Sequence, residues 1–475
     1  METDLLSSHA QDPLTYDSIE KVHHSDKRKI IILGLLSLIF VVSLIVAGII
    51  YRARSHRAAA NTIRRIAPSE ASFLYLNDIH ADPLYSPIIP SKHDCRGDHK
   101  KTIDPHKYGQ YECDSPMELF ESLVSNAKQT NEKPAFILLG GDLIAHGLNT
   151  DSKMLKQSFK NVTAPLEAAF PNTSIYITLG NNDFASDYGS FDTDADNFKT
   201  AYKVFGKWMN DEQSKTFLKG GYYYADFPEV NLRFLFLNSV MYAAKRDQTQ
   251  HAEDPYDQFA WIESSYDDAV QKGFKVSVAL HIPPGVYYYK NKLGWNEDYI
   301  TKFSKIMKKC DFSFILSGHS HTDMFLPLYS PTADKDSVLY SLSAPSVSPV
   351  NYNNPGYRVF ELSNGIVKDY TQYYADLLMN PSVLKWQVEY KFSDAYSASN
   401  VTRETINNAA EWVRTTGEGQ WRYRERIYTR ADEHNAFYYC ALKALLPDDI
   451  VDCENKLNID KLSAQPYYKK ADFLI

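Results

Sequence analysis

The sequence predicts an α/β sandwich that follows one membrane-spanning helix and precedes a mainly helical region. From residue 71 onward, short apolar runs alternate with longer mixed segments, a pattern typical of strands separated by helices and loops. An uncharged apolar run at residues 30–50 has the length that a bilayer crossing requires. With 475 residues, the chain has room for a large core and a smaller unit.

The N-terminal region is predicted to be a cytoplasmic tail (1–29), a transmembrane signal anchor (30–50) and a stalk (51–70). Twenty-nine residues precede the apolar run, whereas a cleavable signal peptide has a shorter apolar stretch nearer the start. Lysine and arginine flank both sides of the run and slightly favour the opposite orientation, so the positive-inside rule does not decide.

Three glycosylation sequons favour a lumenal or extracellular position for the large domain. They begin at Asn161, Asn172 and Asn400. The tail segment Tyr16-Asp17-Ser18-Ile19 resembles a tyrosine-based sorting signal for endosomes and lysosomes. We therefore expect a single-pass type II membrane protein of the lysosome, the vacuole or the cell surface.

Residues 71–370 are predicted to form the catalytic domain, and residues 371–475 a helical C-terminal subdomain. The expected strands are Phe73–Leu76, Ala135–Leu139, Ile175–Leu179, Leu232–Leu237, Val276–Leu280, Phe312–Leu316, Val338–Leu342 and Tyr357–Leu362. The expected helices include Met117–Gln129, Gln258–Gln271, Trp386–Ala398 and Arg403–Trp412.

Five cysteines leave two interpretations open. Cys95 with Cys113, and Cys440 with Cys453, are spaced to close short loops, which would leave Cys310 as a buried free thiol. The alternative is five unpaired cysteines in a reducing compartment. The expected lumenal location favours the two disulfides.

Polar residues of metal-binding types follow five of the apolar runs. They are Asp78 and His80, Asp142, Asn181, His281, and His319 with His321. Open α/β sheets bind ligands at the ends of their strands, so these side chains are expected to converge. Asp78 and His80, like His319 and His321, stand at alternate positions and would point the same way on an extended backbone. Carboxylate, amide and imidazole ligands suit zinc, manganese or iron better than calcium, with zinc as the leading candidate.

The five blocks together resemble the calcineurin-like metallophosphoesterases, and in particular the acid sphingomyelinase-like phosphodiesterases. The resemblance is carried by Leu76-Asn77-Asp78-Ile79-His80-Ala81-Asp82, Gly141-Asp142 with His146, Leu237-Asn238-Ser239, Trp261, His281-Ile282-Pro283-Pro284-Gly285 and Trp386-Gln387-Val388-Glu389-Tyr390. It implies a β-sandwich flanked by helices that binds two divalent metal ions and hydrolyses a phosphodiester or polyphosphate substrate.

The resemblance also implies residue roles. Asp78, His80, Asp142 and His321 would hold one ion, and Asp142, Asn181, His281 and His319 the other. A bridging water that has lost a proton would be the nucleophile. His146 would protonate the leaving group, or would only orient a ligand.

Two departures from the family pattern bear on the substrate. Asn182 stands where the family has a histidine, and Gly180-Asn181-Asn182-Asp183 also occurs in endopolyphosphatases. The segment before Ala71 is too short for the saposin-like domain of acid sphingomyelinase. Endopolyphosphatase or nucleotide phosphohydrolase activity is therefore the alternative, and a catalytically inactive membrane-anchored binding protein is an alternative of another class. The net charge of −8 argues against a nucleic-acid partner.

Overall fold

The structure is a computed structural model that divides the chain into two compact units, residues 1–66 and 67–475. It describes residues 42–43, 46, 70–86, 95–96, 106–148, 151–246, 252–287, 292–328, 339–378, 383–427, 429, 440 and 442. The predicted span at 30–50 lies almost entirely outside these residues. Within the described parts of the chain, none of the helices combines the length and the apolar character that a membrane crossing requires.

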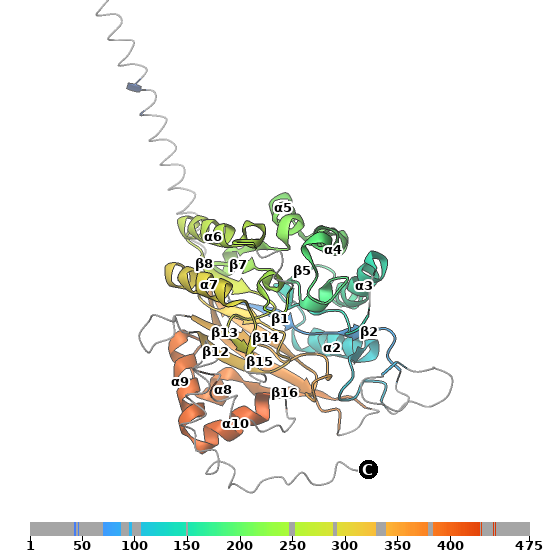
Figure 1. The fold of residues 1–475 in the computed structure, drawn as a ribbon. Coiled ribbons are helices and arrows are strands. Elements are labelled where there is room, and N and C mark those ends of the chain that lie inside the picture. The colour runs from blue at the N-terminus through green and yellow to red at the C-terminus, as the bar shows by residue number, and fades with distance from the viewer. Residues whose placement is uncertain are drawn as a thin grey trace, which may run out of the picture. The chain divides into compact units, whose positions relative to one another are not determined.

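Two six-stranded sheets form the framework of the second unit (Figure 1). In the first sheet, three neighbouring strands run parallel and three further strands add to them in antiparallel fashion. In spatial order they are β16 (Trp386–Lys391), β15 (Ile366–Ala375), β14 (Gly356–Ser363), β1 (Glu70–Leu76), β4 (Phe136–Leu139) and β5 (Ser174–Ile177).

The second sheet has a parallel centre with one antiparallel strand at each edge. Its order is β12 (Met324–Leu328), β13 (Leu339–Ser343), β11 (Ile315–Ser317), β8 (Lys275–Ala279), β7 (Leu232–Phe236) and β6 (Tyr223–Phe227). Two small two-stranded sheets pair β2 (Ala81–Asp82) with β3 (Ser115–Pro116), and β9 (Val286–Tyr287) with β10 (Lys292–Leu293).

Aromatic side chains join the two large sheets. Phe73 of β1 lies 6.1 Å from Phe234 of β7, and Phe136 of β4 lies 4.3 Å from Phe227 of β6, measured between ring centroids. All four side chains are buried. Removing such rings from water supplies the main favourable free energy of folding, and it makes the sandwich a rigid base for the loops at its edge.

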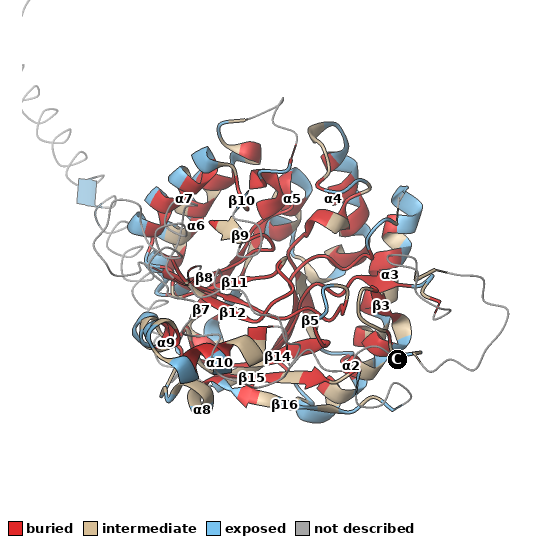
Figure 2. Ribbon diagram, turned by 60° about the horizontal axis from the view of Figure 1, so that its bottom comes forward, coloured by how far each residue is buried: buried red, intermediate tan, exposed pale blue. Residues whose placement is uncertain are grey.

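Helices cover the outer faces of the sheets, as Figure 2 shows by their exposed outer sides and buried inner sides. They are α2 (Met117–Thr130), α3 (Ser152–Ala169), α4 (Phe191–Phe205), α5 (Asp211–Gly220), α6 (Gln258–Lys272), α7 (Glu297–Lys309), α8 (Phe392–Tyr396), α9 (Arg403–Thr415) and α10 (Gly417–Ile427). In α7, the buried residues Tyr299, Phe303 and Ile306 repeat at helical spacing, as an amphipathic surface helix requires.

The apolar runs predicted the strands well, and the C-terminal region less well. Each of the eight predicted strands has a counterpart, although β11 (Ile315–Ser317) covers only the end of the run predicted at 312–316, and the helices predicted at 117–129 and 258–271 are present. The helix predicted at 386–398 is wrong over its first half, because Trp386–Lys391 forms β16 and pairs with β15. The boundary predicted at residue 371 falls inside β15, and the helices α9 and α10 belong to the same compact unit as the two sheets.

The predicted cysteine chemistry agrees with the structure wherever it is described. Cys95 and Cys113 form a disulfide, and Cys310 is a buried free thiol. Cys440 is also disulfide-bonded, while its predicted partner Cys453 lies outside the described residues.

Candidate metal centre

The predicted ligands lie at one edge of the sandwich, beyond the carboxyl ends of parallel strands from both sheets. Asp78, His80 and His321 form one group, whose ligand atoms all lie within 4.8 Å of one another, and Asp142, His281 and His319 form a second group of the same kind. His80 Nε2 of the first group lies 3.6 Å from Asp142 Oδ2 of the second. This arrangement fits two adjacent metal sites that have Asp142 between them.

Left-handed backbone conformations aim most of these side chains. The φ angles are 45° at Asp78, 42° at His80, 51° at Asp142, 69° at His319 and 60° at His321. The prediction of an extended backbone at the paired positions is therefore wrong. Left-handed φ in a non-glycine residue costs roughly 1–3 kcal/mol and is concentrated at functional sites. Here the strands that end at the site hold the turns in place.

Backbone hydrogen bonds between the loops stabilise these turns. The N–H of Asp78 donates to Gly141 O at 3.2 Å, and the N–H of His80 donates to Asp142 O at 3.0 Å. Gly180 allows the next loop to approach, since a Cβ there would lie 2.2 Å from both the backbone nitrogen and Oδ1 of Asp142. The loops after β1, β4 and β5 thus behave as one packed unit.

A hydrogen bond made by Nδ1 fixes the ring orientation of two of the imidazoles. His80 Nδ1 lies 2.9 Å from Ile144 O, and His281 Nδ1 lies 2.8 Å from Gly140 O. A carbonyl oxygen only accepts, so each Nδ1 carries a proton, and Nε2 is the ring nitrogen that the neutral form presents to a metal ion. His281 Nε2 then faces Asp142 Oδ2 at 3.3 Å. Two electron-pair donors at this distance attract a cation between them.

Asn181 presents its amide oxygen in the same way. Its Nδ2 donates to Asp187 Oδ1 at 2.7 Å, which leaves Oδ1 buried and without a hydrogen-bond partner among the described residues. The residue begins the 3₁₀ segment η1 (Asn181–Asp183), whose next residue contacts Asp142. An oxygen that is buried and otherwise unsatisfied fits the role of a metal ligand.

The pKa shifts show how the buried carboxyl and imidazole groups of the pocket act on one another. Burial raises the pKa of Asp78 to about 8, against the opposing charge of His281. Burial lowers the pKa of His281, but the charge of Asp142 and the hydrogen bond to it outweigh this effect and raise the pKa to about 9. Burial also lowers the pKa of His80 to about 4, and that of His319 and His321 well below the ordinary value. His80, His319 and His321 are therefore neutral, whereas His281 keeps a proton against Asp142 that a bound metal ion would displace. Carboxylates with neutral imidazoles are the donors that divalent transition metals bind.

Asp183 organises the centre without being a predicted ligand. Its carboxylate accepts three backbone N–H bonds, from Asp142, Leu143 and Gly180, each at 2.8 Å. It therefore ties the loop after β4 to the loop after β5. Asp183 stands in a segment that the sequence singled out, but its partners Asp142 and Leu143 lie about 40 residues earlier, and no local pattern reveals such a contact.

Asn182 orients the shared carboxylate. Its backbone N–H donates to Asp142 Oδ1 at 2.8 Å, and its side-chain Nδ2 donates to Asp142 Oδ2 at 2.9 Å. A neutral amide at this position directs the lone pairs of Asp142, whereas the histidine of the family pattern could also transfer a proton.

His146 stacks on the first group of ligands. Its ring lies 4.1 Å from the ring of His80 between centroids, at an angle of 17°. Asp114, which no motif indicated, accepts from both the backbone nitrogen and the ring Nδ1 of His146. Burial lowers the pKa of His146, but the hydrogen bond and the charge of Asp114 outweigh it and raise the pKa to about 9.

The C-terminal region supports the last ligand loop. Tyr390 and Arg358 both donate to the carboxylate of Asp323, which lies two residues after His321. The backbone N–H of Asp323 donates to Ile427 O at 2.9 Å. The segment Trp386 to Tyr390 of the predicted family pattern thus acts through packing, by holding the loop that carries His321.

Comparisons with known proteins agree with this geometry. A family model described as calcineurin-like phosphoesterase matches residues 71–323, more than half of the chain. Acid sphingomyelinase-like phosphodiesterase 3b of Mus musculus is 27% identical over 71% of this chain and 78% of its own length. Sphingomyelinase phosphodiesterase D of Dictyostelium discoideum is 28% identical over 69% and 81%, and Cyclic GMP-AMP phosphodiesterase SMPDL3A of Homo sapiens is 26% identical over 83% and 92%.

We predict that Asp183→Asn weakens divalent metal binding by roughly 10- to 100-fold, because an amide cannot accept all three N–H bonds and the loop that carries Asp142 loses its clamp. Titration of the metal-free protein with Zn²⁺ or Mn²⁺ measures the change. The matched control is Asp311→Asn, which removes an exposed carboxylate that pairs with Arg403. Equal affinity in the two variants would contradict the role of Asp183.

Proposed function

The chain belongs to the calcineurin-like phosphoesterase family and is a phosphoric ester hydrolase, and from this premise we propose that it hydrolyses phosphodiesters with two divalent metal ions. The observation that carries the proposal is the pair of buried ligand groups on either side of Asp142. The Nε2 atoms and carboxylate oxygens that face each other there are stable together when cations lie between them.

The proposed ligand sets follow the two groups. Asp78, His80 and His321 would hold one ion, and Asn181, His281 and His319 would hold the other. Asp142 would be a ligand of both ions. When bound, the ions supply the Lewis acidity of the reaction, since they neutralise phosphoryl charge and make water more acidic. Nitrogen ligands outnumber carboxylates, which favours zinc, with manganese and iron as the alternatives.

His146 is the proposed proton donor to the leaving group. Asp114 holds Nδ1, so Nε2 is the ring nitrogen free to face a substrate. The side chain is 48% exposed, which leaves it accessible beside the buried ligands. Asn182 bonds to Asp142 and cannot transfer a proton as imidazolium does, so His146 carries this role alone.

The named relatives and one charged side chain indicate different substrate classes. The relatives are named for sphingomyelinase-like and cyclic dinucleotide phosphodiesterase activity, and a phosphodiester is our first candidate. The second is a substrate with further phosphate groups, such as polyphosphate or a nucleotide. Lys245, an exposed residue, lies 5.2 Å from the Tyr188 ring, and that ring lies 6.4 Å from the ring of His319. An ammonium group here would attract a second phosphate and repel the cationic choline of sphingomyelin.

We also propose a type II topology, with the large domain in the lumen of a lysosome or vacuole or at the cell surface. Disulfides persist in oxidising compartments, and both Cys95–Cys113 and the bonded Cys440 fit that setting. The anchor would be the apolar run at residues 30–50.

Replacing a ligand that both ions share, or a ligand of only one ion, is expected to abolish hydrolysis. Asp142→Ala and His319→Ala should each lower kcat/KM for a chromogenic phosphodiester by about 10³-fold or more, because each change removes several kcal/mol of charge stabilisation in the transition state. Chelation should abolish wild-type turnover, and added divalent metal should restore it.

The control for this experiment is Asp311→Ala, which changes an exposed carboxylate that pairs with Arg403. Circular dichroism checks that the fold survives. Undiminished turnover in either ligand variant would remove the mechanism. A folded wild-type protein that binds metal but hydrolyses nothing would support the inactive binding protein instead.

A substrate panel separates the candidate substrates. Sphingomyelin, a nucleoside triphosphate, long-chain polyphosphate and a chromogenic diester should differ in their response to Lys245→Met. We expect a loss of about tenfold in kcat/KM for the substrates with further phosphates, equivalent to ~1.4 kcal/mol, with Lys245→Arg retaining most activity. Lys199→Met, a change of an exposed lysine on α4 that pairs with Asp196, should have no effect. Equal loss with sphingomyelin and polyphosphate would refute a role in selecting substrates.

Endoglycosidase treatment tests the lumenal assignment. Protein from a eukaryotic host should shift in mobility, and Asn172→Gln should reduce the shift because Asn172 is exposed in a turn. Asn161→Gln should change little, since Thr163 of that sequon is buried in α3. If digestion leaves the electrophoretic mobility of the protein unchanged, that result would argue against a lumenal domain.

A further inference from the structure

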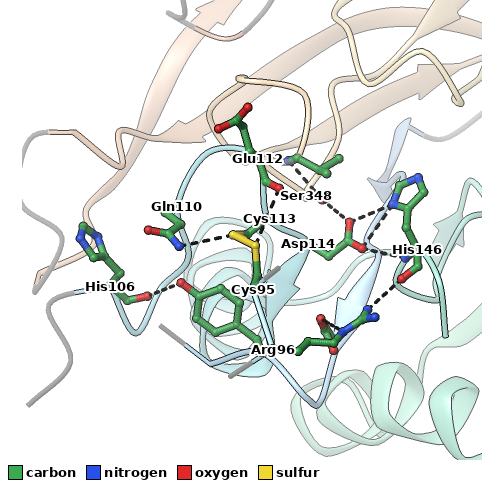
Figure 3. The surroundings of a disulfide bond; sticks show 12 residues. Cys95, Arg96, His106, Gln110, Glu112, Cys113, Asp114, His146 and Ser348 are labelled. Carbon is green, nitrogen blue, oxygen red and sulfur yellow. Dashed lines mark hydrogen bonds and ion pairs between the residues drawn. A yellow bond between two sulfur atoms is a disulfide. The ribbon is translucent and has the colours of Figure 1, made fainter. Parts of the chain in front are cut away.

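We propose that the Cys95–Cys113 disulfide closes a two-point brace around His146, in which Asp114 and Arg96 are positioning residues for proton donation to the leaving group. The inference rests on the proposed function and adds to it the side chains that direct the donor. Figure 3 shows these residues around the disulfide.

Asp114 forms the first point of the brace. Its buried carboxylate accepts from the backbone N–H of His146 at 2.7 Å and from the ring Nδ1 at 3.0 Å. Ser348 Oγ donates to the same carboxylate at 3.2 Å, so its position is set from the other side as well. A carboxylate held in this way fixes both the backbone and the ring of His146 (Figure 3).

Arg96 forms the second point. One of its Nη atoms donates to the backbone oxygen of His146 at 2.8 Å, while Nε donates to Asp82 Oδ2 at 2.7 Å. Asp82 is buried and belongs to β2, directly after the first ligand loop. The guanidinium therefore links the loop that carries His146 to the loop that carries His80.

The disulfide connects the two points. Arg96 follows Cys95 and Asp114 follows Cys113, so each cysteine stands next to one of the side chains that hold His146. The bond joins positions 18 residues apart. Without it, only the backbone through residues 97–112 would connect Arg96 to Asp114.

The brace is needed because packing alone does not fix the donor. The side chain of His146 is 48% exposed, and its stacked contact with His80 includes no directional bond that would distinguish the two ring nitrogens. The bond from Nδ1 to Asp114 makes that distinction and leaves Nε2 as the nitrogen turned away from Asp114. In the reaction, the proton on Nε2 passes to the leaving oxygen as its bond to phosphorus breaks, while the oxygen of a water that has released one proton to solvent forms the new bond to phosphorus; His146 then takes up a proton from solvent.

The dependence of the rate on the leaving group tests this inference. A nitrophenyl leaving group departs without a proton, whereas an alkyl alkoxide requires one, so the ratio of kcat for an alkyl and a nitrophenyl ester of the same phosphate reports on the proton donor. In the full-length protein, His146→Ala should lower this ratio by roughly 100-fold. Asp114→Asn, Arg96→Met and the double variant Cys95→Ser/Cys113→Ser should each lower it by about tenfold, with unchanged metal content.

The matched control is Glu112→Gln, a carboxylate of the same loop whose side chain bonds to Tyr352 and not to His146; it should leave the ratio unchanged. If the double cysteine variant does not fold, Arg96→Met decides. Equal losses for both esters, or no loss, in Asp114→Asn and Arg96→Met would overturn the brace. A wild-type protein without metal-dependent turnover of either ester would instead overturn the proposed function, and the brace with it.

Discussion

The carboxylate of Asp142 is the point on which the rest of the site depends. It lies between two groups of ligands and faces Nε2 of His281 at 3.3 Å and Nε2 of His80 at 3.6 Å. Electron-pair donors buried so close together are unstable without a positive charge between them. The architecture around them is organised to bring them together: Asp183 holds the backbone of Asp142, and Asn182 directs its two oxygens.

This requirement explains features that would otherwise weaken the fold. Left-handed turns at five ligand positions and a glycine at Gly180, where a side chain would collide with Asp142, each restrict the chain. The cost is offset by the sandwich core and by contacts from distant segments, such as the hydrogen bond of Tyr390 to Asp323. The C-terminal strands and helices therefore serve the site indirectly, by holding the loop that presents His319 and His321.

The sequence predicted the ligands because metal chemistry depends on residue types at strand ends, and both are visible in one dimension. It did not predict the backbone that aims them, since alternate spacing at Asp78 and His80 suggested extended strand where the chain turns. It also missed Asp183 and Asp114, whose functions come from partners about 30 to 40 residues away. The sequence did not indicate β16 because its alternation is broken: Val388 and Tyr390 stand two residues apart, yet the first is exposed and the second buried, since the pairing with β15 shifts register between them.

Anomalous diffraction from crystals of the zinc-loaded protein would test the central claim most directly. Two peaks are predicted, one enclosed by Asp78, His80 and His321 and the other by Asn181, His281 and His319, with Asp142 in contact with both. A single peak, peaks elsewhere in the molecule, or an Asp142 carboxylate that touches neither ion would contradict the account.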